Sequence, residues 1–189
     1  MKIGKLINLL SMVLVMLVSG CATSGDTTGS GGSFKRVSAA NELLGKWEGS
    51  INVAIPANKK GYIPKSSIEV SVFLEYIEGD EEINSGMKVD MNRFLTDWVN
   101  VSEVKAAGLT KDQLWEMLTE EYEEDDSMIV GGKYYITSDL SGPEENFLND
   151  TAGYFAINEG RTQLKLVFND PIKFGMGDSG FKEIVLNRK

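Results

Sequence analysis

The sequence predicts a mainly β domain: an antiparallel barrel or sandwich of about eight short strands with a helical insert at roughly residues 92–124. Three observations support this prediction. Apolar and polar residues alternate in successive short segments, turn residues separate these segments, and the apolar period lengthens to that of a helix within the insert. A series of short strands joined by turns is typical of antiparallel barrels and sandwiches.

The first strand is predicted at residues 47–55, where Trp47, Ile51 and Val53 share one face and Glu48 and Asn52 share the other. This alternation is typical of a half-buried strand. Asn158-Glu159-Gly160 predicts a hairpin in which the glycine can take a positive φ, and Asn169-Asp170-Pro171 predicts a turn. The other predicted strands cover residues 68–76, 87–91, 128–130, 133–137, 153–157, 162–168, 172–176 and 181–186.

The helical insert follows the third predicted strand. Phe94, Leu95, Trp98 and Val99 have helical spacing, and Gly108 separates this helix from a second one. Thr110-Lys111-Asp112-Gln113 has the form of a capping box at the start of that second helix. Its apolar stripe is Leu114, Met117, Leu118 and Tyr122.

The first 20 residues have the pattern of an export signal. Lys2 and Lys5 precede an apolar run from Leu6 to Val18, and small residues follow. The run is shorter than the roughly 20 residues that a membrane-spanning helix needs. No later segment is long and apolar enough to span a membrane, so we expect that the mature protein is not an integral membrane protein.

Leu17-Val18-Ser19-Gly20-Cys21 resembles the lipobox of bacterial lipoprotein precursors. The resemblance implies that a signal peptidase recognises Val18, Ser19 and Gly20 and cleaves before Cys21. It also implies diacylglycerol on the Cys21 thiol and often a further acyl chain, such as palmitate, on the new amino terminus. Several acyl chains anchor a protein stably. We therefore expect a lipid-anchored protein of the cell membrane or outer membrane, exposed to the periplasm or the cell surface. Ala22 in place of Asp favours the outer membrane.

Three regions follow from these signals: a signal peptide at 1–20, a lipidated amino terminus with a tether at 21–37, and the β domain at 38–189. Residues 23–33 read TSGDTTGSGGS, a composition typical of flexible linkers. Removal of residues 1–20 leaves 17 basic residues against 28 acidic ones, a net charge of −11. Such an acidic chain disfavours nucleic acid and anionic lipid headgroups as partners.

The composition also excludes several kinds of enzyme. The chain has no histidine, and its one cysteine is Cys21. Histidine triads, the common zinc sites and thiol catalysis are therefore excluded. We predict no catalytic residue, no metal site, no enzyme activity, and no cofactor apart from the lipid on Cys21. The acidic run at 120–126 lacks the ligand spacing of an EF-hand, so a solvated helix end is favoured over a calcium site.

Gly45-Lys46-Trp47, at the start of the first strand, resembles the G-x-W signature of lipocalins and related calycin domains. The resemblance implies an up-and-down β-barrel in which a basic residue of the last strand packs across the tryptophan. Arg188 alternates with Ile184 and Leu186 and is the candidate for that role. The helical insert departs from the lipocalin pattern, in which the helix follows the last barrel strand.

Two functions remain open. The first is a lipocalin-like module that binds a small apolar ligand, or a structural envelope component. One aromatic of Tyr134-Tyr135 and one of Tyr154-Phe155 would face the barrel interior, where each would line a cavity or fill the core. The alternative is an envelope interaction or adhesin-like lipoprotein with no small ligand. It would use the insert as its contact element, with Trp98 and Trp115 as interface residues if they are exposed.

Overall fold

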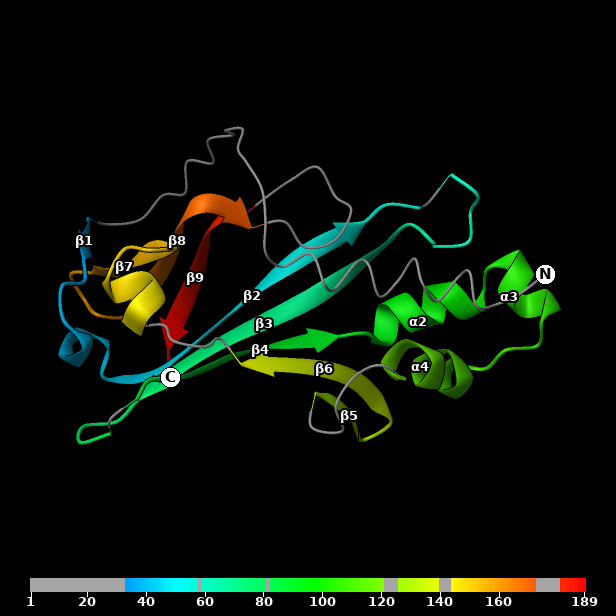
Figure 1. Cartoon of the computed structure of the whole chain (residues 1–189), viewed down its shortest axis with the longest axis horizontal. Helices are drawn as coiled ribbons and strands as arrows, with labels where there is room; N and C mark the ends of the chain where they lie inside the picture. Colours follow the sequence, from blue (N-terminus) through cyan, green and yellow to red (C-terminus); the bar gives the residue numbers. More distant parts are fainter. Residues whose placement is uncertain (1–32, 58, 81, 121–125, 140–143, 173–180) are drawn as a thin grey trace.

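In the computed structural model, the strands form one antiparallel sheet with the order β1-β7-β8-β9-β2-β3-β4-β6-β5 (Figure 1). The structure describes residues 33–57, 59–80, 82–120, 126–139, 144–172 and 181–189. The strands in these ranges are β1 (Phe34–Arg36), β2 (Gly45–Ile55), β3 (Ser66–Tyr76), β4 (Asn84–Asp90), β5 (Ser127–Val130), β6 (Lys133–Asp139), β7 (Gly153–Asn158), β8 (Gln163–Ile172) and β9 (Phe181–Arg188). The prediction of a mainly β antiparallel fold is confirmed.

The closed barrel expected from the sequence is not what the structure shows. The first and last long strands, β2 and β9, do pair at Trp47–Arg188 and Glu48–Asn187, as barrel closure requires. Among the described residues, however, no pairing joins β6 to β7. The reason is that other strands occupy both edges: β5 pairs with β6, and β1 pairs with β7. The sheet is therefore open between β6 and β7, and its two edge strands are β5, next to β6, and β1, next to β7.

Strand β1 begins the fold earlier than the sequence indicated. Phe34, Lys35 and Arg36 pair with Asn158, Ile157 and Ala156 of β7, although residues 21–37 are predicted as a tether. Three residues are too few to show an alternating pattern, so only the edge of β7 reveals this strand. The folded domain starts at or before Phe34.

The helical insert is confirmed, and its described part contains three short helices, α2 (Asn92–Val99), α3 (Ser102–Ala106) and α4 (Lys111–Thr119). Gly108 has a φ of +68° between α3 and α4. The predicted capping box is present: Gln113 N donates to Thr110 Oγ1, and Thr110 N donates to Gln113 Oε1. The part of the insert at 121–125 lies outside the described residues.

Two turn predictions were wrong in detail. In the β7–β8 hairpin the residue with positive φ is Arg161, at +49°, and not Gly160. The Asn158 side chain accounts for this, because its Oδ1 accepts from the backbone N–H groups of Thr162 and Gln163. The predicted turn at 169–171 lies within β8, where the register with β9 shifts between Val167 and Ile172.

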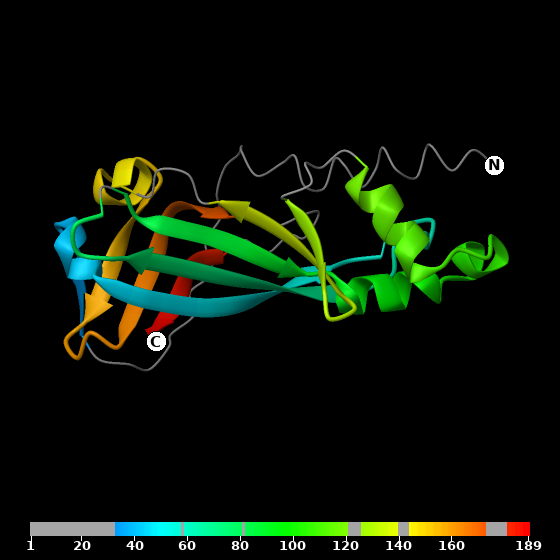
Figure 2. The ribbon, with the colours of Figure 1, turned by 90° about the horizontal axis from the view of Figure 1, so that it is seen from below.

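The sheet is curved, and its two ends differ. The 3-10 helix η1 (Ala40–Leu43) and the short helix η2 (Glu144–Leu148) lie at the end that carries β1 and β7, whereas α2, α3 and α4 lie at the other end (Figures 1 and 2). The core lies on the concave face of this sheet, which we call the inner face. It carries Trp47, Val70, Val72 and Leu74 and, from the last strand, Leu186.

Candidate ligand-binding face

At the η1 end of the inner face, the G-x-W segment and the last strand meet. Trp47 is fully buried, and its Nε1 donates to Leu43 O at 2.7 Å. The Arg188 guanidinium carbon lies 5.4 Å from the centroid of the Trp47 ring, and its Nη2 donates to Leu44 O at 3.2 Å. Gly45 has a φ of +119°, and a Cβ there would lie 3.2 Å from Arg188 Nη2. These contacts account for the glycine, the tryptophan and the distant arginine together.

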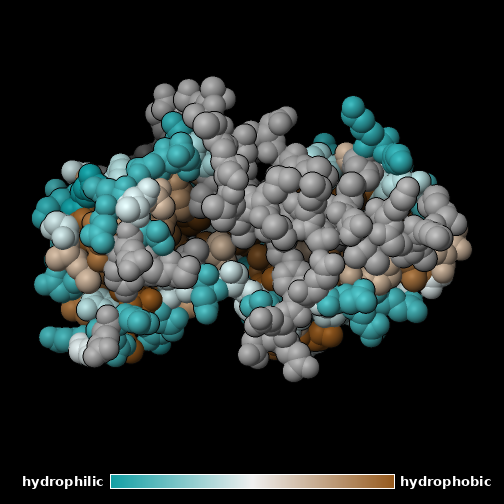
Figure 3. All heavy atoms as spheres, in the orientation of Figure 1, coloured by the Kyte–Doolittle hydropathy of each residue, from teal (hydrophilic) through white to brown (hydrophobic). Residues whose placement is uncertain are grey.

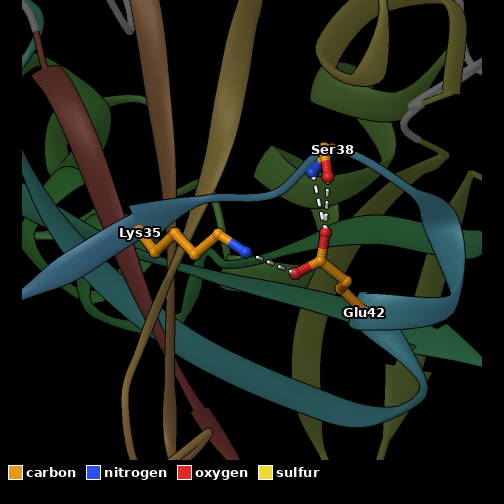
Figure 4. A network of polar contacts seen from close by, with 3 residues as sticks. All are labelled: Lys35, Ser38 and Glu42. Atoms are coloured by element: carbon orange, nitrogen blue, oxygen red, sulfur yellow. Dashed lines mark hydrogen bonds and ion pairs between the residues drawn. The ribbon is translucent and has the colours of Figure 1, made fainter.

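The segment before Gly45 is held by one carboxylate. Glu42 Oε1 accepts from both the backbone N and the Oγ of Ser38 at 2.9 Å, and Lys35 Nζ lies 4.0 Å from Glu42 Oε2 (Figure 4). The hydrogen bond from the Ser38 backbone is the main cause that lowers the pKa of Glu42. This network fixes η1, which in turn supplies the Leu43 carbonyl that accepts from Trp47.

Gly49 determines how closely β9 approaches β2. A Cβ on Gly49 would lie 2.2 Å from Val185 O and 2.9 Å from Leu186 Cδ2. A glycine in a strand often marks such a close backbone approach. The contact brings β9 over β2 next to the buried Trp47, so the inner face is solidly packed at this end.

Further along β2 the inner face is less covered. Ile51 pairs with Val70 of β3, Val70 with Val89 of β4, and Val89 with Ile136 of β6. Directly opposed residues of antiparallel strands lie on the same face, so these four side chains form one row. Val70 and Ile136 are buried, whereas Ile51 and Val89 at alternate places are only half-buried.

Met87 lies next to this row, opposite Val72, and Ile55 lies nearer the helices, opposite Ser66. Both are also half-buried. We call Ile51, Ile55, Met87 and Val89 the inner patch. Figure 3 shows hydrophobic atoms at several places on one face of the molecule, among more hydrophilic ones.

The inner face continues onto the edge strand β5. Ile129 pairs with the buried Tyr134, which places both on this face, and Ile129 is 55% exposed. Its neighbour Val130 is 53% exposed. The open side of the sheet, between β6 and β7, is therefore bordered by exposed aliphatic side chains.

At the opposite end, α2 and α4 are hydrogen-bonded to the sheet. Asn92 Oδ1 accepts from Tyr134 N at 3.1 Å, and Asp97 Oδ2 accepts from Ser66 Oγ at 2.6 Å. Tyr134 Oη donates to Asp112 Oδ1 at the start of α4. This hydrogen bond is the main cause that raises the pKa of Tyr134, because it favours the neutral phenol.

The structure places only some of the residues singled out from the sequence. Val18, Ser19, Gly20 and Cys21 lie outside the described residues. Trp47 and Arg188 are brought into contact, but across the seam of an open sheet and not at the closure of a barrel.

The aromatic residues follow the predicted alternation. Tyr134 and Phe155 are buried, while their neighbours Tyr135 and Tyr154 are half-buried. Tyr135 lies under the Lys88 ammonium, at 4.0 Å from ring centroid to Nζ. The two helical tryptophans, in contrast, do not form an exposed patch: Trp98 and Trp115 are 3% and 5% exposed.

Sequence reasoning missed the inner patch because these residues look like ordinary core positions. The exposed β5 edge was also missed. Within the described ranges, no cluster of Cys, Asp and Glu side chains is arranged to hold a metal ion. No helix in the described part of the chain is long and apolar enough to cross a membrane.

The comparisons with known proteins found no matching family, no similar curated protein and no similar solved structure.

Proposed function

We propose that the protein is a lipid-anchored lipoprotein of the cell envelope whose β domain is a lipocalin-like module, opened between β6 and β7, that binds a small apolar ligand. The apolar ligand is inferred from the inner patch, where apolar side chains remain half-buried next to the packed core. Burial of apolar surface contributes about 25 cal/mol per Å², so such a patch favours an apolar occupant.

The lipocalin-like part of the proposal is supported by the seam between the first and last long strands. Trp47 and Arg188 are register partners there, and the positive φ of Gly45 and its close contact with Arg188 disfavour other residues at this position. The anchor is supported by the lipobox at Leu17–Cys21 and by the glycine-rich segment that follows it. We assign the chain no catalytic activity, because it has no histidine and its cysteine carries lipid in this proposal.

The ligand is tested on the chain from Ala22 onward, which retains every described element. We expect native mass spectrometry after gentle purification to show a lipid-sized adduct, and a fluorescent apolar probe to compete with it. Ile51→Asp should abolish probe binding, because it introduces a charge into the inner patch. Asn52→Asp, on the exposed face of the same strand, is the matched control. A protein that carries no adduct and binds no apolar probe would contradict the ligand proposal.

A second candidate, protein–protein interaction at the envelope, is favoured by the β5 edge and not by the helical tryptophans. Ile129 and Val130 are exposed on an edge strand without a charged residue, whereas the other edge, β1, carries Lys35 and Arg36. Charged residues protect edge strands from pairing with other chains. Cross-linking in intact cells from a photoreactive residue at position 130 would test this candidate. Position 48, exposed on β2, is the control, and equal capture at both positions would argue against it.

A further inference from the structure

Strand β5 is an edge strand whose outer side is unpaired within the described part of the chain. A two-residue turn, Gly131-Gly132, joins it to β6, and the two glycines have φ angles of +57° and +74°. A turn with two positive φ angles matches the twist of a hairpin. Since β5 is the last strand in the order of the sheet, it is bonded to β6 on one side, and its other side can accept a further strand.

The hydrogen-bond pattern shows which backbone groups of β5 face its outer side. Thr137 N donates to Asp126 O at 2.8 Å, so these opposed residues are a hydrogen-bonded pair. Bonded and non-bonded pairs alternate along an antiparallel ladder. Met128 is therefore bonded to β6, and the next residue, Ile129, is not. The N–H and C=O groups of Ile129 consequently point away from β6, toward the free side of the strand.

We propose that β5 pairs antiparallel with β5 of a second copy of this chain, about a two-fold axis at Ile129. The two Ile129 residues would exchange a pair of backbone hydrogen bonds, because the outward groups of each face those of the other. Met128 of each copy would lie opposite Val130 of the other, so apolar side chains oppose apolar ones. This inference rests on the second candidate function, interaction at the β5 edge, and names its partner; it does not depend on the apolar ligand.

The pairing would cover aliphatic side chains that the single chain leaves exposed. Ile129 and Val130 are 55% and 53% exposed, and residues 127–130 include no charged residue that would protect the edge. A two-fold axis perpendicular to the sheet reverses the strand direction and keeps the face. The two copies would therefore form one continuous sheet with their inner faces on the same side.

The register at Ile129 is favoured over the neighbouring register at Met128. With the axis at Met128, the exposed Val130 would lie opposite the Asp126 carboxylate of the other copy, and an aliphatic side chain gains nothing from a charge. With the axis at Ile129, Asp126 lies opposite Gly132 in the turn. This glycine has no side chain to cover the carboxylate, which stays in water.

The charge of Asp126 favours the antiparallel arrangement over a parallel one in the same register. A parallel pair would place the two Asp126 residues side by side, about 5 Å apart. In the antiparallel pair they are six positions, or about 20 Å, apart along the strand. This exceeds the Debye length of about 8 Å at physiological ionic strength, so their repulsion is screened. The net charge of −11 still opposes association, and added salt should therefore strengthen the dimer.

The test uses the chain from Ala22 onward, which keeps every described element and contains no cysteine. Sedimentation velocity over a dilution series should show a monomer–dimer equilibrium that shifts toward the dimer at higher salt. Ile129→Lys places two ammonium groups opposite each other and should weaken dimerisation about tenfold or more. Ile77→Lys is the matched control, because Ile77 is similarly exposed, at 53%, and lies just after β3. It should dimerise as the parent does.

Single cysteines locate the axis. Ile129→Cys should form an intermolecular disulfide under mild oxidation, because a residue on the axis lies opposite itself at a Cα distance that a disulfide spans. Met128→Cys and Ile77→Cys should cross-link much more slowly. A disulfide that forms fastest in Met128→Cys, or a dimer that Ile129→Lys does not weaken, would overturn the proposed pairing.

A chain that stays monomeric at every concentration, and that cross-links no faster from position 129 than from position 77, would show that the partner is not a second copy. Photo-cross-linking from position 130 in intact cells then separates the two failures. Capture of a different protein keeps the interaction function and overturns only the self-pairing, whereas no capture overturns both. Capture of a second copy of this chain supports both.

Discussion

Arg188, near the end of the last strand, lies over the buried ring of Trp47, near the start of the first long strand, at 5.4 Å from the ring centroid. The two residues are also register partners across the β2–β9 seam. A cation over an indole face contributes about 0.5–1 kcal/mol at an exposed site. The additional hydrogen bond from Arg188 to Leu44 O connects the same side chain to the segment that enters β2.

Arg188→Met should lower the free energy of unfolding by about 1–2 kcal/mol, because it removes the cation–π contact and the hydrogen bond but keeps much of the apolar stem. Urea unfolding followed by tryptophan fluorescence measures this change. Lys189→Met, which removes only an exposed ion pair with Glu48, should cost less than about 0.5 kcal/mol. Equal losses for the two variants would show that the Trp47–Arg188 contact contributes nothing specific.

Gly49→Ala should destabilise the protein by about 2 kcal/mol or more, because its Cβ would overlap Val185 O and force β9 away from β2. Ser50→Ala, at the exposed neighbouring position, is the control and should change stability by less than about 0.5 kcal/mol. Hydrogen exchange of the β9 amides should accelerate in Gly49→Ala. If exchange accelerates only in the helices, the close approach at Gly49 does not hold the seam.

Tyr134→Phe should remove a pH-dependent part of the stability. The hydrogen bond to Asp112 raises the pKa of Tyr134 above its ordinary value of 10.0. The stabilisation is therefore complete below about pH 10 and is lost as the pH rises through the folded-state pKa. Unfolding measured from pH 8 to 11 should show a smaller decline in Tyr134→Phe than in the parent protein. Tyr135→Phe, on the opposite face, should decline as the parent does.

Glu42→Gln should remove stability in the opposite pH direction. Ser38 lowers the pKa of Glu42 below its ordinary value of 4.5. The contribution of this carboxylate is therefore present above about pH 4.5 and is lost as the pH falls through the lower folded-state pKa. Thermal unfolding should show that Glu42→Gln is less stable than the parent at pH 7 and that the difference narrows toward pH 3. A difference that stays constant with pH would rule out the carboxylate as its source.

Cys21→Ser tests the anchor independently of the ligand. In the proposed anchor the thiol carries the lipid and precedes cleavage, so without it the protein should leave the detergent phase on phase partitioning or accumulate unprocessed. Ser24→Ala, in the predicted tether, should partition like the parent protein. A Cys21→Ser protein that is still cleaved to the mature size and still partitions into the detergent phase would contradict the lipoprotein proposal.

The β class, the long strands β2 and β3, the helical insert and the capping box at Thr110 could all be predicted from the sequence, because each depends on local periodicity or local hydrogen bonds. The resemblance to the G-x-W signature also implied that Trp47 and Arg188 form a pair, although 141 positions separate them. The place where the sheet opens could not be predicted, because it depends on contacts between distant strands. The opening depends on which strands pair with the outer edges of β6 and β7. The strands that do so, β5 with four residues and β1 with three, are too short for their sequence pattern to indicate a partner. The burial of Trp98 and Trp115 was decided in the same way, since a helical stripe shows which residues share a face but not what that face packs against.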